Sequence, residues 1–534
     1  MNSLSSKDIS RAVFTALATA LICAYLLWSV IFGGNPLGLN VPVGIVIFYA
    51  SLFVSLHGHT DLRAANNILM LPLIFVLALS FAIFNNVLLQ VLAFLSIIIL
   101  TAAQVSLMTG LFAHEPYSAS FSGEICTAIF LRPFHRIGDY YKSLFSSFGS
   151  NSRRIGFVFL GIAIALPVAI ILLLLLASAD SVFGKMLSGI FNSGSVVDML
   201  TYLLLFALLA TFGGSFAMSL LRGAGKPAFK EKPEKKQLPA TPLIAALTVI
   251  CAILLIFSVV QVVFLFGGGT LPKGLTYSSY ARSGFFQLCA AAAIVFAVTA
   301  ISLSLKKRLT GGRTFMNVLL TLLCASIFIM LVSSFYRMAL YEGAFGFTRL
   351  RLYVQAFMIL LAVVNAYVAA RVWVKLPVMK LTFYTVFIAL IGLIFFNVDG
   401  FIAKNTTADL STAVVSRNEY LERYDSDSFF GTNVFNSDSY LLGLSEDALP
   451  YYIDSLKTSI LDKKSYGADD DYDDSYKTDC ETARIQVAYR IVSLLDRSRD
   501  GDWRSYNWYR AVAGRIADDH KELLEKAQSV LDNK

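Results

Sequence analysis

The stretch LTFYTVFIALIGLIFFNV, residues 381–398, decides the fold, and DGFIAKN follows it directly at residues 399–405. The eighteen residues of the stretch carry no charge. An α-helix rises about 1.5 Å per residue, so the stretch covers about 27 Å, close to the thickness of the hydrocarbon core of a bilayer. We therefore expect the last membrane span here, with a polar region after it.

The composition favours a membrane protein. Of the 534 residues, 56% are hydrophobic and 15% are charged, whereas about a quarter of the residues of a soluble protein are charged. Residues 1–398 hold 27 Lys and Arg against 10 Asp and Glu, and residues 399–534 hold 17 against 26. The basic excess thus belongs to membrane-flanking loops, and it does not indicate a nucleic-acid partner.

The apolar runs predict an all-α polytopic membrane protein with about eleven transmembrane helices and a C-terminal helical extramembrane domain. Two spans each are expected within 12–56 and 64–113, and one each within 155–179, 199–221, 237–272, 283–305, 314–336, 352–370 and 381–398. Polar residues in mid-span are expected to join helices rather than to carry ions. They are Gln104, Ser258, Gln261, Asn317 and Asn365.

One segment between the spans combines charges with aromatic residues. Residues 119–148 predict an amphipathic helix lying in the membrane interface, with Arg132, Arg136 and Lys142 towards the headgroups. The alternative is a connecting helix packed on the bundle.

The distribution of basic residues predicts the orientation, because Lys and Arg accumulate in cytoplasmic loops. With the N-terminus inside, 21 of them fall on the interior side and six in the exterior loops before residue 399. We therefore expect a transmembrane bundle over 1–398 with a basic cytoplasmic loop at 222–241. The acidic helical domain at 399–534 is then extracytoplasmic, and its run 469–474 is expected to loop out. These expectations place the protein in a cell membrane.

Several stretches resemble a bacterial family of polytopic membrane proteins known only as a domain of unknown function. They are PLGLNVPVGI (36–45), LLASADSVF (175–183), LPKGLTYSSYARSGFFQL (271–288), RMALYEGAFGFTRLRLYV (337–354), NVDGFIAKN (397–405), DSYLLGLSEDALP (438–450) and DWRSYNWYRA (502–511). The resemblance covers nearly the whole chain. It implies location and architecture and supplies no catalytic residues.

Five charged residues at the ends of spans are candidates for an outward-facing site. They are Asp180, Arg282, Arg337, Glu342 and Asp399. The expected topology places all five at one membrane face, where charges are costly unless they are paired or hydrated. If they form one ligand site, Arg282 and Arg337 receive an anionic group and Asp180 and Asp399 orient them. The alternative is that they are ordinary interfacial charges that fix helix ends.

No motif predicts a cofactor, a metal site or a catalytic centre. His57 and His59 of HGHTD lack a further ligand nearby, and the run DDDYDD (469–474) lacks the glycine and the terminal glutamate of a calcium loop. The Lys-rich segment 222–236 is a candidate site for anionic lipid headgroups, although its role as a positive cytoplasmic loop that sets the topology explains it sufficiently.

These observations favour a non-enzymatic envelope sensor or scaffold that binds a ligand or partner at its outer face. An envelope protein or a small molecule is the expected partner of the tail. The alternatives are a transporter of a neutral or amphipathic solute and an enzyme acting on a lipid-linked substrate.

Overall fold

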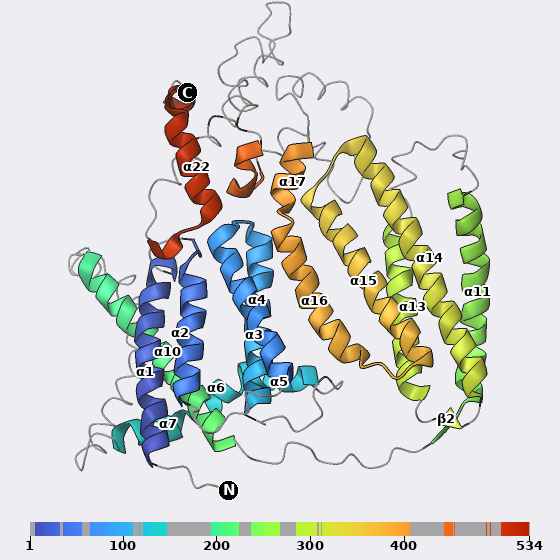
Figure 1. The fold of residues 1–534 in the computed structure, drawn as a ribbon, viewed down its shortest axis with the longest axis horizontal. Helices are drawn as coiled ribbons and strands as arrows, with labels where there is room; N and C mark the ends of the chain where they lie inside the picture. Colours follow the sequence, from blue (N-terminus) through green and yellow to red (C-terminus); the bar gives the residue numbers. More distant parts are fainter. Residues whose placement is uncertain are drawn as a thin grey trace, which may run out of the picture. The chain divides into compact units, whose positions relative to one another are not determined.

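The structure is a computed structural model, and it describes a large part of the chain (Figure 1). The described residues are 6–31, 36–55, 65–109, 117, 121–146, 194–223, 237–266, 285–306, 309–310, 312–405, 443–451, 453, 488, 492 and 503–532. They fall into two compact units, one of residues 1–230 and 497–514 and the other of residues 231–496 and 515–534.

The first unit is built on four helices that follow one another in an up-and-down order. They are α1 (Ser6–Ile31), α2 (Asn40–Ser55), α3 (Ala65–Ile83) and α4 (Val87–Met108), and each packs against the next or the one before. Asn86 begins α4, where its side chain accepts a hydrogen bond from the backbone N–H of Leu89 at 3.2 Å. Short turns between uncharged runs thus produce antiparallel neighbours.

Three short helices follow α4 where one amphipathic helix is expected. They are α5 (Phe121–Phe130), α6 (Arg132–His135) and α7 (Ile137–Ser146). The Arg132 guanidinium donates to the Ser106 hydroxyl of α4 at 2.7 Å instead of lying free for headgroups, and Arg136 pairs with Asp139 at 2.8 Å. These helices therefore pack on the bundle. Their depth in the membrane stays a prediction.

Helix α10 (Gly194–Gly223) runs along the first unit from one end to the other. Near its start, the Thr201 hydroxyl accepts a bond from the Trp28 indole at 3.4 Å, close to the end of α1. Further along, the Ser215 hydroxyl accepts a bond from the Arg136 backbone N–H at 3.2 Å. The end of α1 and the short helices α6 and α7 therefore lie at opposite ends of α10.

The second unit contains the other long apolar helices. They are α11 (Thr241–Phe266), α13 (Phe285–Leu305), α14 (Arg313–Phe345), α15 (Arg349–Trp373) and α16 (Val378–Phe395), followed by the short α17 (Val398–Asn405). Two-residue strands β1 (Leu238–Pro239) and β2 (Leu309–Thr310) pair in parallel, with Leu238 opposite Leu309. This pairing brings the chain before α11 next to the chain before α14.

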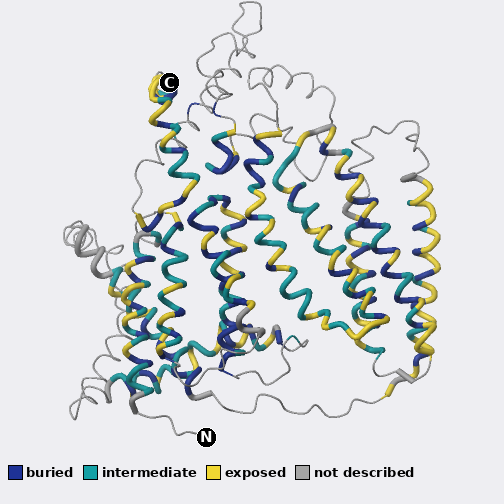
Figure 2. Tube along the Cα trace, in the orientation of Figure 1, coloured by how far each residue is buried: buried dark blue, intermediate teal, exposed yellow. Residues whose placement is uncertain are grey.

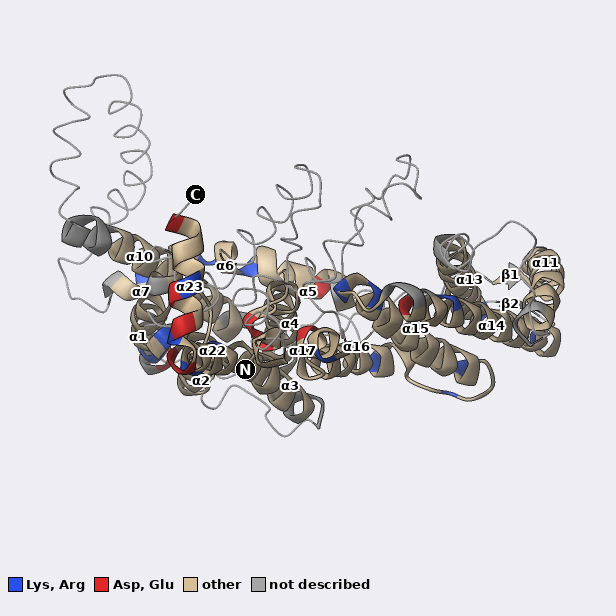
Figure 3. Ribbon diagram, turned by 90° about the horizontal axis from the view of Figure 1, so that it is seen from above, with Lys and Arg blue, Asp and Glu red and all other residues tan. Residues whose placement is uncertain are grey.

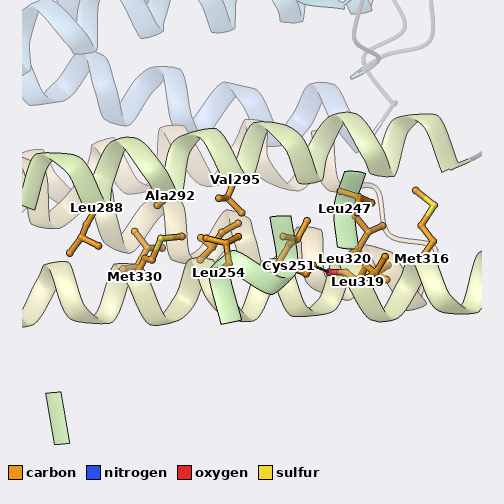
Figure 4. Close-up of a cluster of buried hydrophobic side chains, with 14 of the residues drawn as sticks. Leu247, Cys251, Leu254, Leu288, Ala292, Val295, Met316, Leu319, Leu320 and Met330 are labelled. Carbon is orange, nitrogen blue, oxygen red and sulfur yellow. Dashed lines mark hydrogen bonds between the residues drawn. The ribbon is translucent and has the colours of Figure 1, made fainter. Parts of the chain in front are cut away.

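The core of the second unit lies between α11, α13, α14 and α15 (Figure 4). Its side chains are mostly Leu and Met, with the small Ala292 of α13 at the contact with α14. The Cys251 thiol of α11 donates to the Leu319 carbonyl of α14 at 3.5 Å. Because lipid is as apolar as leucine, such helices are held by close packing and by polar bridges between them.

Three of the polar residues expected to join helices do so. Gln104 of α4 accepts a bond from the Tyr49 hydroxyl of α2 at 2.5 Å, and the Asn365 amide of α15 donates to the Cys324 carbonyl of α14 at 2.9 Å. Gln261 of α11 accepts a bond from the Ser333 hydroxyl of α14 at 2.7 Å. The Ser258 hydroxyl and the Asn317 side-chain oxygen are buried without a hydrogen-bond partner in the described part of the chain.

Figure 2 shows exposed positions along the long helices, and many of these positions hold large hydrophobic residues. On α11, Ile253, Ile256, Val259 and Val263 are each more than 60% exposed. Figure 3 shows the described helices mostly free of charge. Within the described residues, eight helices are long and apolar enough to cross a membrane, and 40–55 and 69–83 are shorter apolar helices. The chain is therefore an all-α polytopic membrane protein. The span expected at 155–179 lies outside the described residues.

Candidate functional site

An ion pair with a buried carboxylate lies at the end of the second unit where α15 begins and α16 ends. Asp399, the second residue of α17, is 1% exposed. Its two carboxylate oxygens accept bonds from the Nε and Nη2 atoms of Arg349, each at 2.5 Å. This bidentate geometry is the strongest form of an Arg–carboxylate pair. The carboxylate also lies in the first turn of α17, where a negative charge stabilises the helix.

The same carboxylate holds a turn of the C-terminal tail. The backbone N–H of Ser445 donates to Asp399 Oδ2 at 3.1 Å, and the Ser445 hydroxyl donates to the same atom at 2.5 Å. Ser445 precedes the 3₁₀ turn η2 (Glu446–Ala448), which packs on α17. We call Arg349, Asp399 and Ser445 the Asp399 junction, because it connects α15, α17 and the tail.

The sequence NVDG shapes this junction. α16 ends at Phe395, so the helix stops three residues before the expected end of the span at Val398. Asn397 then adopts a φ of 50° and its side-chain oxygen accepts the Gly400 N–H at 3.0 Å. Asparagine tolerates a positive φ and caps a new helix. A Cβ on Gly400 would lie 2.6 Å from the Asn397 side-chain amide and 2.8 Å from the Tyr451 ring, so a larger residue would force these side chains to move.

Glu342 lies in the last turn of α14 and is 6% exposed. Its Oε2 atom accepts a bond from the Gln355 amide of α15 at 2.5 Å, whereas its Oε1 atom is buried and has no hydrogen-bond partner among the described residues. Burial raises the pKa of Glu342, and the Gln355 bond and the charge of Arg351 offset part of that rise. Gly346, with a φ of 72°, ends α14 next to this site.

The candidate residues do not share one set of contacts. Arg337 of α14 is 9% exposed, and its Nη2 atom lies 3.5 Å from the Gln261 side-chain oxygen of α11. Helix α15 supplies partners to two of the candidates, Gln355 to Glu342 and Arg349 to Asp399. Asp180 and Arg282 lie outside the described residues. That all five converge on one ligand stays a prediction.

A second polar contact brings the end of the chain onto the first unit. The Asn507 amide donates to the carbonyls of Phe81 and Phe84, each at 2.9 Å. These carbonyls belong to the last turn of α3 and the residue after it, which lack partners within the helix. Asn507 is 1% exposed, so the bonds form away from water. Asn507 thereby caps α3 from more than 400 residues away in the sequence.

Two arginines strengthen this contact. The Arg504 guanidinium donates to the Tyr25 carbonyl of α1 at 2.7 Å and lies 4.5 Å from the centre of the Tyr25 ring. The Arg510 guanidinium donates to the Asn85 side chain at 3.0 Å. We call residues 503–510 the docking segment. It includes the 3₁₀ turn η4 (Trp503–Ser505) and the start of α22 (Trp508–Asp519).

The turn before α2 also contacts the docking segment. The Leu39 N–H donates to the Tyr506 carbonyl at 3.0 Å. A Cβ on Gly38 would lie 2.5 Å from that carbonyl oxygen, so the close approach requires glycine. The docking segment therefore lies at the end of the first unit where α1 and α3 end and α2 and α4 begin.

Sequence reasoning identified Asp399 and missed its partners. Those partners are Arg349 and Ser445, and neither is among the candidates named from the sequence. Asn507 and Arg504 have no helical periodicity that marks them. The signal that points to these four residues is their place in the stretches RMALYEGAFGFTRLRLYV, DSYLLGLSEDALP and DWRSYNWYRA, which carry the family resemblance.

The fold and these polar ends define a polytopic α-helical membrane protein with a C-terminal tail attached to its helices. Comparison with known sequences identifies the family: the Domain of unknown function (DUF4153) matches residues 71–454, and the chain belongs to it. No curated protein and no solved structure matches the chain.

Proposed function

We propose that the protein is a non-enzymatic sensor or scaffold of the cell envelope, whose tail binds a partner on the outer side of the membrane. The observation that carries this proposal is the Asp399 junction. A sensor needs a firm connection between the part that binds and the part that spans the membrane. Asp399 provides one, because a single buried carboxylate holds both the first residue of α15 and a tail turn.

The side of the membrane is inferred from the charges of the loops. The excess of Lys and Arg on one side, 21 against six, favours a cytoplasmic N-terminus and an extracytoplasmic tail. The docking segment and the end of α1 lie at the same end of the first unit, which is consistent with an N-terminus and a tail on opposite sides.

Site-specific photo-crosslinking in intact cells tests the proposal. The crosslinker replaces Tyr451, which is 48% exposed next to the Asp399 junction, and a control replaces Val259, which is 62% exposed on the apolar face of α11. We expect one protein adduct of defined mass at position 451 and none at position 259. The adduct should weaken when Asp399→Asn is added at unchanged protein abundance.

Two outcomes would argue against this function. The first is an adduct that forms in equal yield at positions 451 and 259, or whose yield at position 451 does not change when Asp399→Asn is added. Either result would mean that the junction does not position a binding surface. Uptake of a neutral solute by liposomes containing the purified protein, without any adduct at position 451, would favour a transporter instead.

A further inference from the structure

Basic side chains gather at the end of the second unit opposite the Asp399 junction. Lys306 follows α13, Arg313 begins α14, and Arg371 and Lys375 lie at and just after the end of α15. In Figure 1 these helix ends lie together beside β2. The Lys306 ammonium donates to the Val372 carbonyl at 2.9 Å, which fixes it against the end of α15 next to Arg371.

The positive charges in this cluster repel one another. Burial lowers the pKa of Lys306, and the charges of Arg313 and Arg371 lower it further. The Arg371 guanidinium donates to the Leu376 carbonyl, which is a neutral partner. Among the described residues, no ion pair joins a carboxylate to any of these four side chains. The sequence explains why: between Lys235 and Val398 the one acidic residue is Glu342, at the other end of α14.

Apolar residues border the cluster. Trp373 is 59% exposed and Val374 is 58% exposed, and they lie two and three residues after Arg371. The Trp373 indole donates to the Thr321 hydroxyl of α14 at 3.0 Å, so the ring is held in place on the surface of the bundle. A tryptophan of this kind marks the boundary between hydrocarbon and headgroups.

We propose that Lys306, Arg313 and Arg371 form a binding site for the phosphate headgroup of an anionic phospholipid. The cations provide the charge that the phosphate needs, and the exposed Trp373 and Val374 face the acyl chains of the same lipid. The neutral backbone partners of Lys306 and Arg371 leave further N–H groups available to phosphate oxygens. A membrane lipid is favoured over free phosphate because the cluster lies at the boundary of the apolar surface.

Lipid binding to the full-length protein in nanodiscs tests this site. The measurement is the retention of phosphatidylglycerol by native mass spectrometry, with phosphatidylcholine as the neutral reference. A cation near anionic lipid contributes about fivefold in affinity, so Arg313→Gln with Arg371→Gln should weaken phosphatidylglycerol retention about thirtyfold. Binding of phosphatidylcholine should not change.

Matched variants separate charge from structure. Lys404→Gln with Lys521→Gln removes two exposed cations elsewhere in the second unit and should leave retention unchanged. Arg313→Lys with Arg371→Lys keeps both charges and should preserve most of the retention. If the double glutamine variant does not fold, wild-type protein in rising salt tests the same point, because screening should reduce retention.

Three results with the lipids would overturn the proposal, and a fourth concerns inorganic phosphate. They are equal retention of the two lipids by the wild type, wild-type retention by the double glutamine variant, and insensitivity to salt. Inorganic phosphate that displaces the lipid at low concentration and binds as tightly by itself would also overturn it, because the site would then belong to a soluble anion.

Discussion

Replacing Asp399 by asparagine tests whether the junction holds the tail to the helices. Asparagine has nearly the same shape, but its amide NH₂ faces an Arg349 N–H in either orientation. It faces Nε alone, or Nη2 together with the Ser445 N–H and hydroxyl. Hydrogen bonds to a charged group contribute about 1.5–3 kcal/mol each, and removing one partner of a buried pair costs about 3–5 kcal/mol. The Arg349 side chain is 31% exposed and can regain water, so we expect the lower value, about 3 kcal/mol.

Hydrogen exchange on the full-length protein measures this loss locally. A cost of about 3 kcal/mol raises the open population of the tail turn about 100-fold. Exchange of the amides of residues 444–449 should therefore quicken by about that factor, while the core amides of α14 near Leu320 keep their wild-type rates. The readout needs no knowledge of the partner.

A matched ion pair provides the control. Asp8 pairs with Arg11 at 2.8 Å on α1, and their side chains are 22% and 33% exposed. Asp8→Asn should change stability by less than about 1 kcal/mol, because exposed pairs are weak. Unchanged exchange at 444–449 in Asp399→Asn would refute the reasoning, and so would equal effects of the two variants.

Three further predictions follow from other contacts. Asn507→Ala removes the Asn507 donor from the Phe81 and Phe84 carbonyls, of which the Phe84 carbonyl keeps the bond from the Gln90 amide at 2.8 Å. It should lower the unfolding free energy of the full chain by about 1–2 kcal/mol, seen as a lower melting temperature; an unchanged melting temperature would contradict this. Because burial raises the pKa of Glu342 above its unfolded value, the folded state holds that proton more tightly, and stability should fall as pH rises from the unfolded to the folded pKa. Glu342→Gln should abolish this slope and melt higher than wild type above that range, and a slope that persists would mean that another group titrates. Single cysteines at exposed Trp508 and exposed Phe134 should label from opposite sides of intact cells, since the docking segment and α6 lie at opposite ends of the first unit; labelling from one side would refute that arrangement.

Hydrophobicity predicts the spans well, because any segment that crosses a bilayer must be long and apolar whatever its partners are. The helices over 241–263, 287–305 and 349–373 lie where the uncharged runs place them. The end of the last span was placed too late, because Asn397 is polar but small and does not interrupt the apolar run. Its positive φ is visible only in the structure.

The partners of the polar ends could not be predicted in the same way. Arg349 and Asp399 are fifty residues apart, and Asn507 lies more than 400 residues from the carbonyls that it caps. No periodicity connects such positions, since they meet only after the helices have packed. The sequence shows which charged residues lie at helix ends and need a partner, and the packing of the helices determines which residue is that partner.

The Asp399 junction and the Asn507 cap of α3 affect whether the tail can fold as a separate domain. A cut at residue 398 would leave Asp399 without Arg349 and would leave Asn507 without the α3 carbonyls. Each loss removes a contact that holds the tail to the helices and leaves the polar group to water. We therefore expect residues 399–534 expressed alone to lose helical signal and to melt without cooperativity. Such a dependence would suit the proposed sensor, because a tail that folds only against the spans can report its own binding to them.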